Sequence, residues 1–151
     1  MRIQRSGTIW VGLLLTGLLP LPLLAQSGNS TSGKSTSDGV YSADQAQQGE
    51  ALYNKQCASC HGEKLEGSGQ NPPLAGNDFM TDWKGRPLAD LYTKIHDTMP
   101  ATNPGSLTPD QTVELIAFVL KSNSMPAGTT ALPEDPSALK SIQISAPVAK
   151  P

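Results

Sequence analysis

The chain has few of the residues that build a large core or a hydrolytic site. Aromatic side chains make up 5% of its 151 residues, and it contains only two cysteines and two histidines. It has no alternating strand pattern, no internal repeat, no Gly-rich phosphate loop and no Ser/His/Asp arrangement. These absences argue against a β-protein, a nucleotide-binding fold and a triad hydrolase. The low content of aromatic residues also means that a small domain would have a thin core.

The balance of charge excludes further classes of partner. The whole chain has 11 basic and 13 acidic side chains, and removal of residues 1–25 would leave 9 basic against 13 acidic. A negative surface argues against binding to nucleic acid and to an anionic membrane surface. It allows a basic or neutral protein partner.

Both cysteines and one of the histidines occur together, as Cys57-Ala58-Ser59-Cys60-His61. Cys-x-x-Cys-His is the attachment motif for c-type haem. On a helical turn, residues three and four apart share one side, so two thiols could each add to a vinyl group of one porphyrin. The imidazole of His61 would then be the first axial ligand of the iron. A buried porphyrin would also supply the apolar area that the aromatic-poor core lacks.

Two other interpretations of this motif remain open at this point. A disulfide or thioredoxin-like site also uses Cys-x-x-Cys, but such a site follows a strand, and no strand pattern precedes Cys57. A zinc site needs about four ligands, and the thiol and imidazole donors are limited to Cys57, Cys60, His61 and His96.

The N-terminal 25 residues have the pattern of a secretory signal peptide. A basic start with Arg2 and Arg5 precedes an apolar run from about residue 9 to 24, followed by Ala25. An uncleaved anchor is the alternative, although the run is short for a span and Pro20 and Pro22 interrupt it. The sequence predicts cleavage and a periplasmic or otherwise exported protein with no remaining membrane span. Haem is attached to thiols outside the cytoplasm, so export suits the motif.

The remaining chain divides by composition into three parts. Residues 26–40 are rich in Ser, Gly and Thr, which predicts a flexible linker. Residues 41–125 carry the organised pattern of one domain. Residues 126–151 are rich in Pro and Ala; we expect partial docking through Leu132, Leu139 and Ile142, and disorder beyond Ser145.

Helical periodicity dominates the domain. A first helix is predicted from Ser42, with Gln45 completing a capping box, and it should end near His61-Gly62. Gly49 is costly inside a helix, which is consistent with a close helix–helix crossing. Residues 62–83 are rich in Gly, Pro and Asn and predict a wrapping loop.

Two further helices follow the loop. One begins at Pro87 and ends at Thr98-Met99-Pro100, and the other begins near Thr108-Pro109. The predicted fold is therefore all-α, with three to five helices wrapped around one covalently attached haem.

The second axial ligand has four candidates, Met80, His96, Met99 and Met125. Methionine opposite histidine raises the reduction potential and suits a one-electron carrier. Met99 lies between a helix and the Pro100–Pro104 loop, where the chain can turn its thioether toward the iron. His96 would give a bis-histidine haem, Met80 is better explained by core packing, and Met125 begins the tail.

The chain resembles a class I c-type cytochrome, in particular the small cytochrome c domain that stands alone or is fused to quinoprotein alcohol dehydrogenases. The resemblance covers about residues 39–144 and rests on these pieces: Gly49, Tyr53, Cys57–Gly62, Pro72–Gly76, Phe79, Trp83, Thr98–Pro100, Pro104–Leu107, Ala117–Leu120, Pro126–Gly128 and the Leu132–Leu139 tail.

This resemblance implies further roles. Met99 matches the distal methionine. Pro72 matches the proline whose carbonyl accepts a hydrogen bond from the proximal histidine, a contact that would fix the tautomer of His61. Trp83 and Arg86 fall where such domains bind or cover the haem propionates.

Together these observations predict an electron carrier rather than an enzyme. The predicted protein is an exported mono-haem cytochrome, with His61 and Met99 as axial ligands, that passes electrons from a periplasmic dehydrogenase to a respiratory acceptor. Its redox partners would include a quinoprotein alcohol dehydrogenase or a terminal oxidase. The alternatives are a haem protein with an exchangeable sixth ligand, acting as a gas sensor or peroxidase, and an electron-transfer subunit of a dehydrogenase complex.

Overall fold

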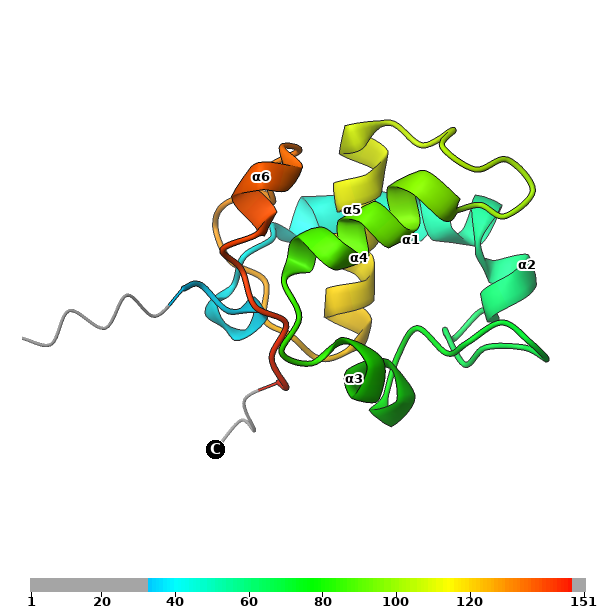
Figure 1. Cartoon of the computed structure of the whole chain (residues 1–151), viewed down its shortest axis with the longest axis horizontal. Helices are drawn as coiled ribbons and strands as arrows, with labels where there is room; N and C mark the ends of the chain where they lie inside the picture. The colour runs from blue at the N-terminus through cyan, green and yellow to red at the C-terminus, as the bar shows by residue number, and fades with distance from the viewer. Residues whose placement is uncertain (1–32, 148–151) are drawn as a thin grey trace, which may run out of the picture. The chain divides into compact units, whose positions relative to one another are not determined.

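A computed structural model describes residues 33–147 of the chain. The predicted signal peptide lies outside these residues. The described part is all-α, as expected, and contains isolated β-bridges but no named strand. Its elements, shown in Figure 1, are η1 (Thr36–Asp38), α1 (Ala43–Gln56), α2 (Ala58–His61), α3 (Asn77–Trp83), α4 (Leu88–Thr98), α5 (Pro109–Ser122) and α6 (Pro136–Leu139).

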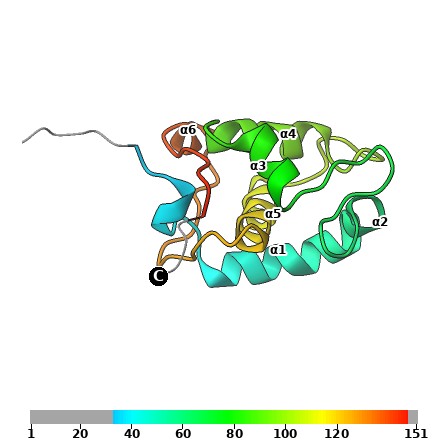
Figure 2. The same ribbon diagram turned by 90° about the horizontal axis from the view of Figure 1, so that it is seen from below.

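The long helices pack around α5. Figure 2 shows α1 and α4 on opposite sides of it, and both contact it. The face of α5 toward them is apolar because Val113, Ile116 and Leu120 are completely buried. Thr108 caps this helix in a full capping box with Gln111, and Pro109 occupies its first turn.

Gly49 lies where α1 crosses α5 and confirms the expected close approach. A Cβ atom added to this glycine would overlap the backbone carbonyl of Glu114 and come within 3.0 Å of the Cβ of Phe118. Tyr53, one turn further along α1, packs against Phe118 with the two rings tilted and their centroids 5.2 Å apart. The missing side chain of Gly49 therefore allows the two helix backbones to meet.

The first predicted helix is interrupted at the haem motif. It begins as expected, with the Ser42 hydroxyl accepting from the Gln45 N–H, but α1 ends at Gln56, and Cys57 departs from helical geometry before α2 begins. The capping box expected at Ser42 was wrong in one of its two hydrogen bonds, because the Gln45 side chain does not bond back to the Ser42 backbone. The side chain of Gln45 pairs instead with both backbone groups of Leu132, at 2.7 and 3.0 Å.

The expectation of an entirely irregular segment over residues 62–83 was also wrong, because its last part forms α3. Phe79 anchors this short helix in the core with no exposed surface. A single buried aromatic residue is too weak a periodic signal to predict a seven-residue helix.

Both ends of the described chain are packed on the helices. Residues 33–40 are not a linker throughout, since the Thr36 side chain is completely buried and its hydroxyl accepts a hydrogen bond from the Ser145 N–H. The extension buries Leu132, Leu139, Ile142 and also Ile144. Ordered contacts reach Ala146, whose carbonyl accepts from the Ser37 hydroxyl at 2.9 Å.

Among residues 33–147, no helix has the length and apolar character needed to cross a membrane.

Candidate haem-binding cleft

The Cys-x-x-Cys-His residues lie at the junction of α1 and α2. The Cys57 carbonyl accepts from the N–H groups of Cys60 and His61, at 3.1 and 2.9 Å, which holds the motif in one tight turn. Both cysteines are free thiols; Cys57 is half-buried and Cys60 is exposed. The described residues contain no cluster of three or more His, Cys, Asp or Glu side chains able to hold a metal ion.

His61 is oriented by the loop that follows it. The ring is buried, and its Nδ1 lies 3.0 Å from the carbonyl oxygen of Pro72. A carbonyl oxygen can only accept, so Nδ1 carries the proton in this contact and Nε2 keeps a free lone pair. The expected contact between His61 and Pro72 is thus present in the structure, and it leaves Nε2 available as a ligand atom.

Four further hydrogen bonds hold the loop that carries Pro72. The Gly67 N–H donates to the His61 carbonyl at 2.8 Å, and the Leu74 N–H donates to the Leu65 carbonyl at 2.9 Å. The buried side chain of Asn123 donates to the Leu74 carbonyl and accepts from the Gly76 N–H, both at 3.0 Å. Sequence reasoning missed Asn123, because an asparagine just past a helix normally indicates only a C-terminal cap.

A single cleft joins these residues to a distant part of the chain. The space outside protein atoms there is about 1130 Å³, open solvent at the mouth included. Its lining is mostly apolar and comes from α1 through α5. The predicted site residues found in it are Cys57, Cys60, His61, Pro72, Trp83 and Met99.

This placement distinguishes Met99 from the other candidates for the second axial ligand. Met80, His96 and Met125 do not line the cleft. The Nδ1 of His96 lies 2.8 Å from the carboxylate of Asp97, and Met125 is buried in the core. Of the four candidates, only Met99 lines the same cleft as His61.

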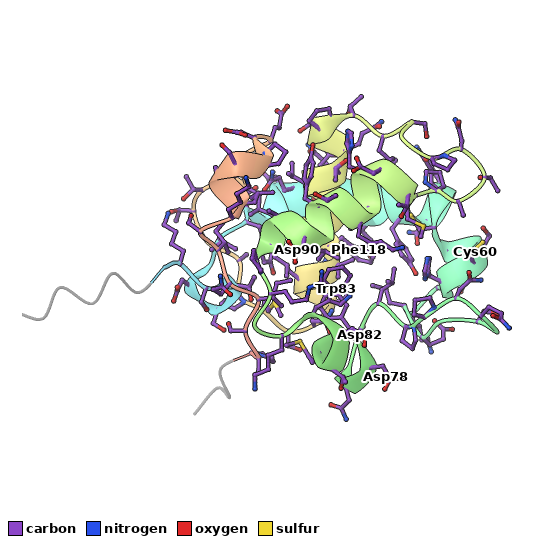
Figure 3. The ribbon with its side chains drawn as sticks, in the orientation of Figure 1. Cys60, Asp78, Asp82, Trp83, Asp90 and Phe118 are labelled. Carbon is purple, nitrogen blue, oxygen red and sulfur yellow. The ribbon has the colours of Figure 1, made fainter. Side chains whose placement is uncertain are left out.

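Trp83, at the end of α3, and Cys60, in α2, both line the cleft but come from different helices (Figure 3). The Trp83 ring stacks on Phe79 with centroids 6.3 Å apart. Arg86 does not line the cleft, and its expected role in binding or covering the propionates stays a prediction. Its guanidinium lies 4.5 Å from the centre of the Trp83 ring and pairs with Asp90 at 3.0 Å. Arg86 therefore supports Trp83 from outside.

Burial at the motif changes two acid–base equilibria. Burial, together with the neighbouring Cys60, raises the pKa of the Cys57 thiol to about 11, so this thiol is protonated at neutral pH. Burial also raises the pKa of Tyr53 to about 12, and its hydroxyl donates to the Gly62 carbonyl at 2.6 Å. Tyr53 thereby ties α1 to the end of the motif.

The residues present fit a c-type haem. Two cysteines, one histidine with a free Nε2 and one methionine line a largely apolar cleft, and thiols, imidazole and thioether are the groups that hold haem iron and its porphyrin. Polar groups also line the cleft, including Asn71, Asp82 and Lys94. The sequence did not single out these three, because they carry no motif or spacing.

Comparison with known proteins gives one family. Residues 44–119, just over half of the chain, match the family described as cytochrome C oxidase, cbb3-type, subunit III. Among solved structures, the sulfane dehydrogenase SoxCD from Paracoccus pantotrophus is similar, with 30% identity over 60% of this chain and a TM-score of 0.45. The match spans 54% of that chain, so this chain corresponds to little more than half of its length. A search among curated proteins finds no match.

Proposed function

This chain is a cytochrome c electron carrier and belongs to the family described as cytochrome C oxidase, cbb3-type, subunit III; from this premise we propose that it carries one covalent haem c with His61 and Met99 as axial ligands. The observation that supports this proposal is the meeting of both thiols, His61 and Met99 in one cleft. When bound, the haem would supply an iron that gains or loses one electron.

The chain's own residues have distinct tasks in this proposal. Cys57 and Cys60 would hold the porphyrin through two thioether bonds. The Pro72 carbonyl keeps the proton on Nδ1 of His61, which presents Nε2 in a fixed orientation. Apolar lining residues such as Leu91, Ile95 and Val119 exclude water from the iron's surroundings. A site that holds both axial ligands in place moves little between oxidation states, which suits electron transfer.

We further propose that the protein is exported and exchanges electrons with other redox proteins. The Cys-x-x-Cys-His motif requires attachment outside the cytoplasm, and the first 25 residues resemble a signal peptide. The donor would be a periplasmic dehydrogenase, with a quinoprotein alcohol dehydrogenase as one candidate. The family description names a subunit of a terminal oxidase, which makes such an oxidase a candidate acceptor. The excess of acidic side chains favours a basic docking surface on the partner.

Substitution of Met99 tests the proposed ligation. A Met99→Ala variant should keep its haem, because both cysteines remain. It should lose the charge-transfer absorption of a methionine–ferric iron pair, show a lower reduction potential, and bind carbon monoxide readily when reduced. These changes are measured by optical spectroscopy and redox titration.

Met80→Ala is the matched control, since Met80 does not line the cleft, and it should leave the absorption band in place. An unchanged spectrum in Met99→Ala would overturn the assignment of Met99. Rapid stoichiometric binding of carbon monoxide to the unsubstituted protein would instead favour an exchangeable sixth position, and with it a sensor or peroxidase.

A further inference from the structure

Three extended segments from distant parts of the chain pair through their backbones. Residues 142–144, here called the pairing segment, lie between residues 34–36 and residues 85–88. On one side, the Gln143 N–H donates to the Lys34 carbonyl and the Thr36 N–H donates to the Gln143 carbonyl, at 2.8 and 2.9 Å. These two bonds join the C-terminal extension to the start of the described chain.

The other side of the pairing segment holds the connection between α3 and α4. The Gly85 N–H donates to the Ile144 carbonyl at 2.7 Å, and the Ile144 N–H donates to the Arg86 carbonyl at 2.9 Å. The Leu88 N–H donates to the Ile142 carbonyl at 2.8 Å. Ile142 and Ile144 are also buried, so apolar packing adds to these three bonds.

The connection between α3 and α4, held in this way, supports Trp83. It begins directly after Trp83, and the Arg86 N–H donates back to the Trp83 carbonyl at 3.1 Å. The Arg86 guanidinium lies against the Trp83 ring, and Asp90 at the start of α4 holds that guanidinium by an ion pair. The pairing segment thus fixes the turn that contains Arg86. The side chain of Arg86 in turn covers the Trp83 ring, which forms one wall of the cleft.

We propose that the pairing segment is a positioning element for the haem cleft, which holds Trp83 against the cleft and limits the access of water. This inference rests on the proposed function of the cleft as a haem site. The pairing segment lies outside residues 44–119, the part that matches the family model. Loosening it should admit water beside the iron, stabilise the more highly charged oxidised state and lower the reduction potential.

Amide hydrogen exchange tests the pairing without any substitution. Leu88 is the first residue of α4, and the first four N–H groups of a helix lack intrahelical partners. Its protection from exchange therefore depends on the Ile142 carbonyl. We expect the Leu88 amide to exchange at least about tenfold more slowly than the amide of Ala43, the first residue of α1. Equal exchange at both positions would overturn the proposal.

Paired proline substitutions test the effect on the cleft. Ile144→Pro removes the hydrogen bond to Arg86, whereas Gln143→Pro removes the one to Lys34 on the opposite side. Ile144→Ala controls for the lost buried side chain. In the exported protein, from which residues 1–25 have been cleaved, Trp83 is the remaining tryptophan. There, Ile144→Pro should raise tryptophan fluorescence by moving the ring away from the haem, and should lower the reduction potential. Both changes should exceed those in Gln143→Pro and Ile144→Ala.

Equal fluorescence and equal potential in the three folded variants would contradict the proposal. A failure of the haem assignment gives a different result: the chain would show no haem absorption, and the slow exchange of Leu88 would persist.

Discussion

A Gly49→Ala variant is expected to unfold at a temperature about 10–20 °C lower than the unsubstituted protein. The added methyl group would overlap the Glu114 carbonyl at the crossing of α1 and α5, and overpacking of this kind costs about 2–3 kcal/mol. Both helices line the cleft, α1 through Tyr53 and α5 through Val119. Moving the helices apart should therefore also distort the cleft. Thermal unfolding followed by circular dichroism measures the effect.

The sign of this change is what makes it diagnostic. In an unobstructed helix interior, alanine is more favourable than glycine by about 1 kcal/mol. Gln48→Ala, at an exposed neighbouring position of α1, is the matched control and should leave the unfolding temperature nearly unchanged. If Gly49→Ala instead stabilised the protein, the close crossing of α1 and α5 would be wrong.

An Asn123→Ala variant is expected to lose about 2–4 kcal/mol of stability. The buried amide makes three hydrogen bonds, to the Leu74 and Val119 carbonyls and from the Gly76 N–H, and each contributes about 1 kcal/mol. The same bonds hold the loop that carries Pro72, so the orientation of His61 should become less uniform and the reduction potential should shift. Denaturant unfolding and a redox titration measure the two effects.

Asn103→Ala provides the control for Asn123. Asn103 lies exposed in the loop after Met99, and its backbone N–H, which alanine retains, donates to the Pro100 carbonyl. This variant should unfold within about 0.5 kcal/mol of the unsubstituted protein. Equal stability of Asn123→Ala and Asn103→Ala would show that Asn123 does not support the loop.

The parts of the fold that follow local rules were predictable from the sequence. Thr108 and Pro109 start α5 because a hydroxyl cap and a proline at the first position satisfy that helix end locally. Gly49 indicated a close crossing because glycine inside a helix needs a compensating contact. The all-α class followed from the same periodicity.

The parts that depend on distant partners were not predictable. Gln45 could have completed a local capping box, but the Leu132 backbone, 87 residues away, offers both a donor and an acceptor and takes its side chain. Residues 33–40 have a linker-like composition, yet the bonds of Thr36 to Gln143 and Ser145 order them. The composition of a segment indicates how much conformational entropy is lost when it becomes ordered. It does not show which distant segment will supply the contacts that offset this loss.

The candidate site shows the same division. The motif at Cys57–His61 came from residue type and spacing, and the choice of Met99 came from its place in the chain and from the resemblance; both line one cleft in the structure. The role of Arg86 at the propionates came from resemblance alone and stays a prediction; in the structure Arg86 pairs with Asp90 and lies against the Trp83 ring. The role of Asn123 depends on a loop nearly 50 residues earlier in the chain, which no local pattern reveals.

The central claim is that Cys57 and Cys60 hold one haem c in this cleft. The most direct measurement is the optical spectrum of the purified exported protein, oxidised and reduced, followed by denaturation in alkaline pyridine and extraction with acidified acetone. Our account predicts one haem per chain, the pyridine spectrum of a haem bound through two thioethers, and colour that stays with the protein on extraction. A colourless protein with two titratable thiols, or a haem that the solvent removes, would contradict it.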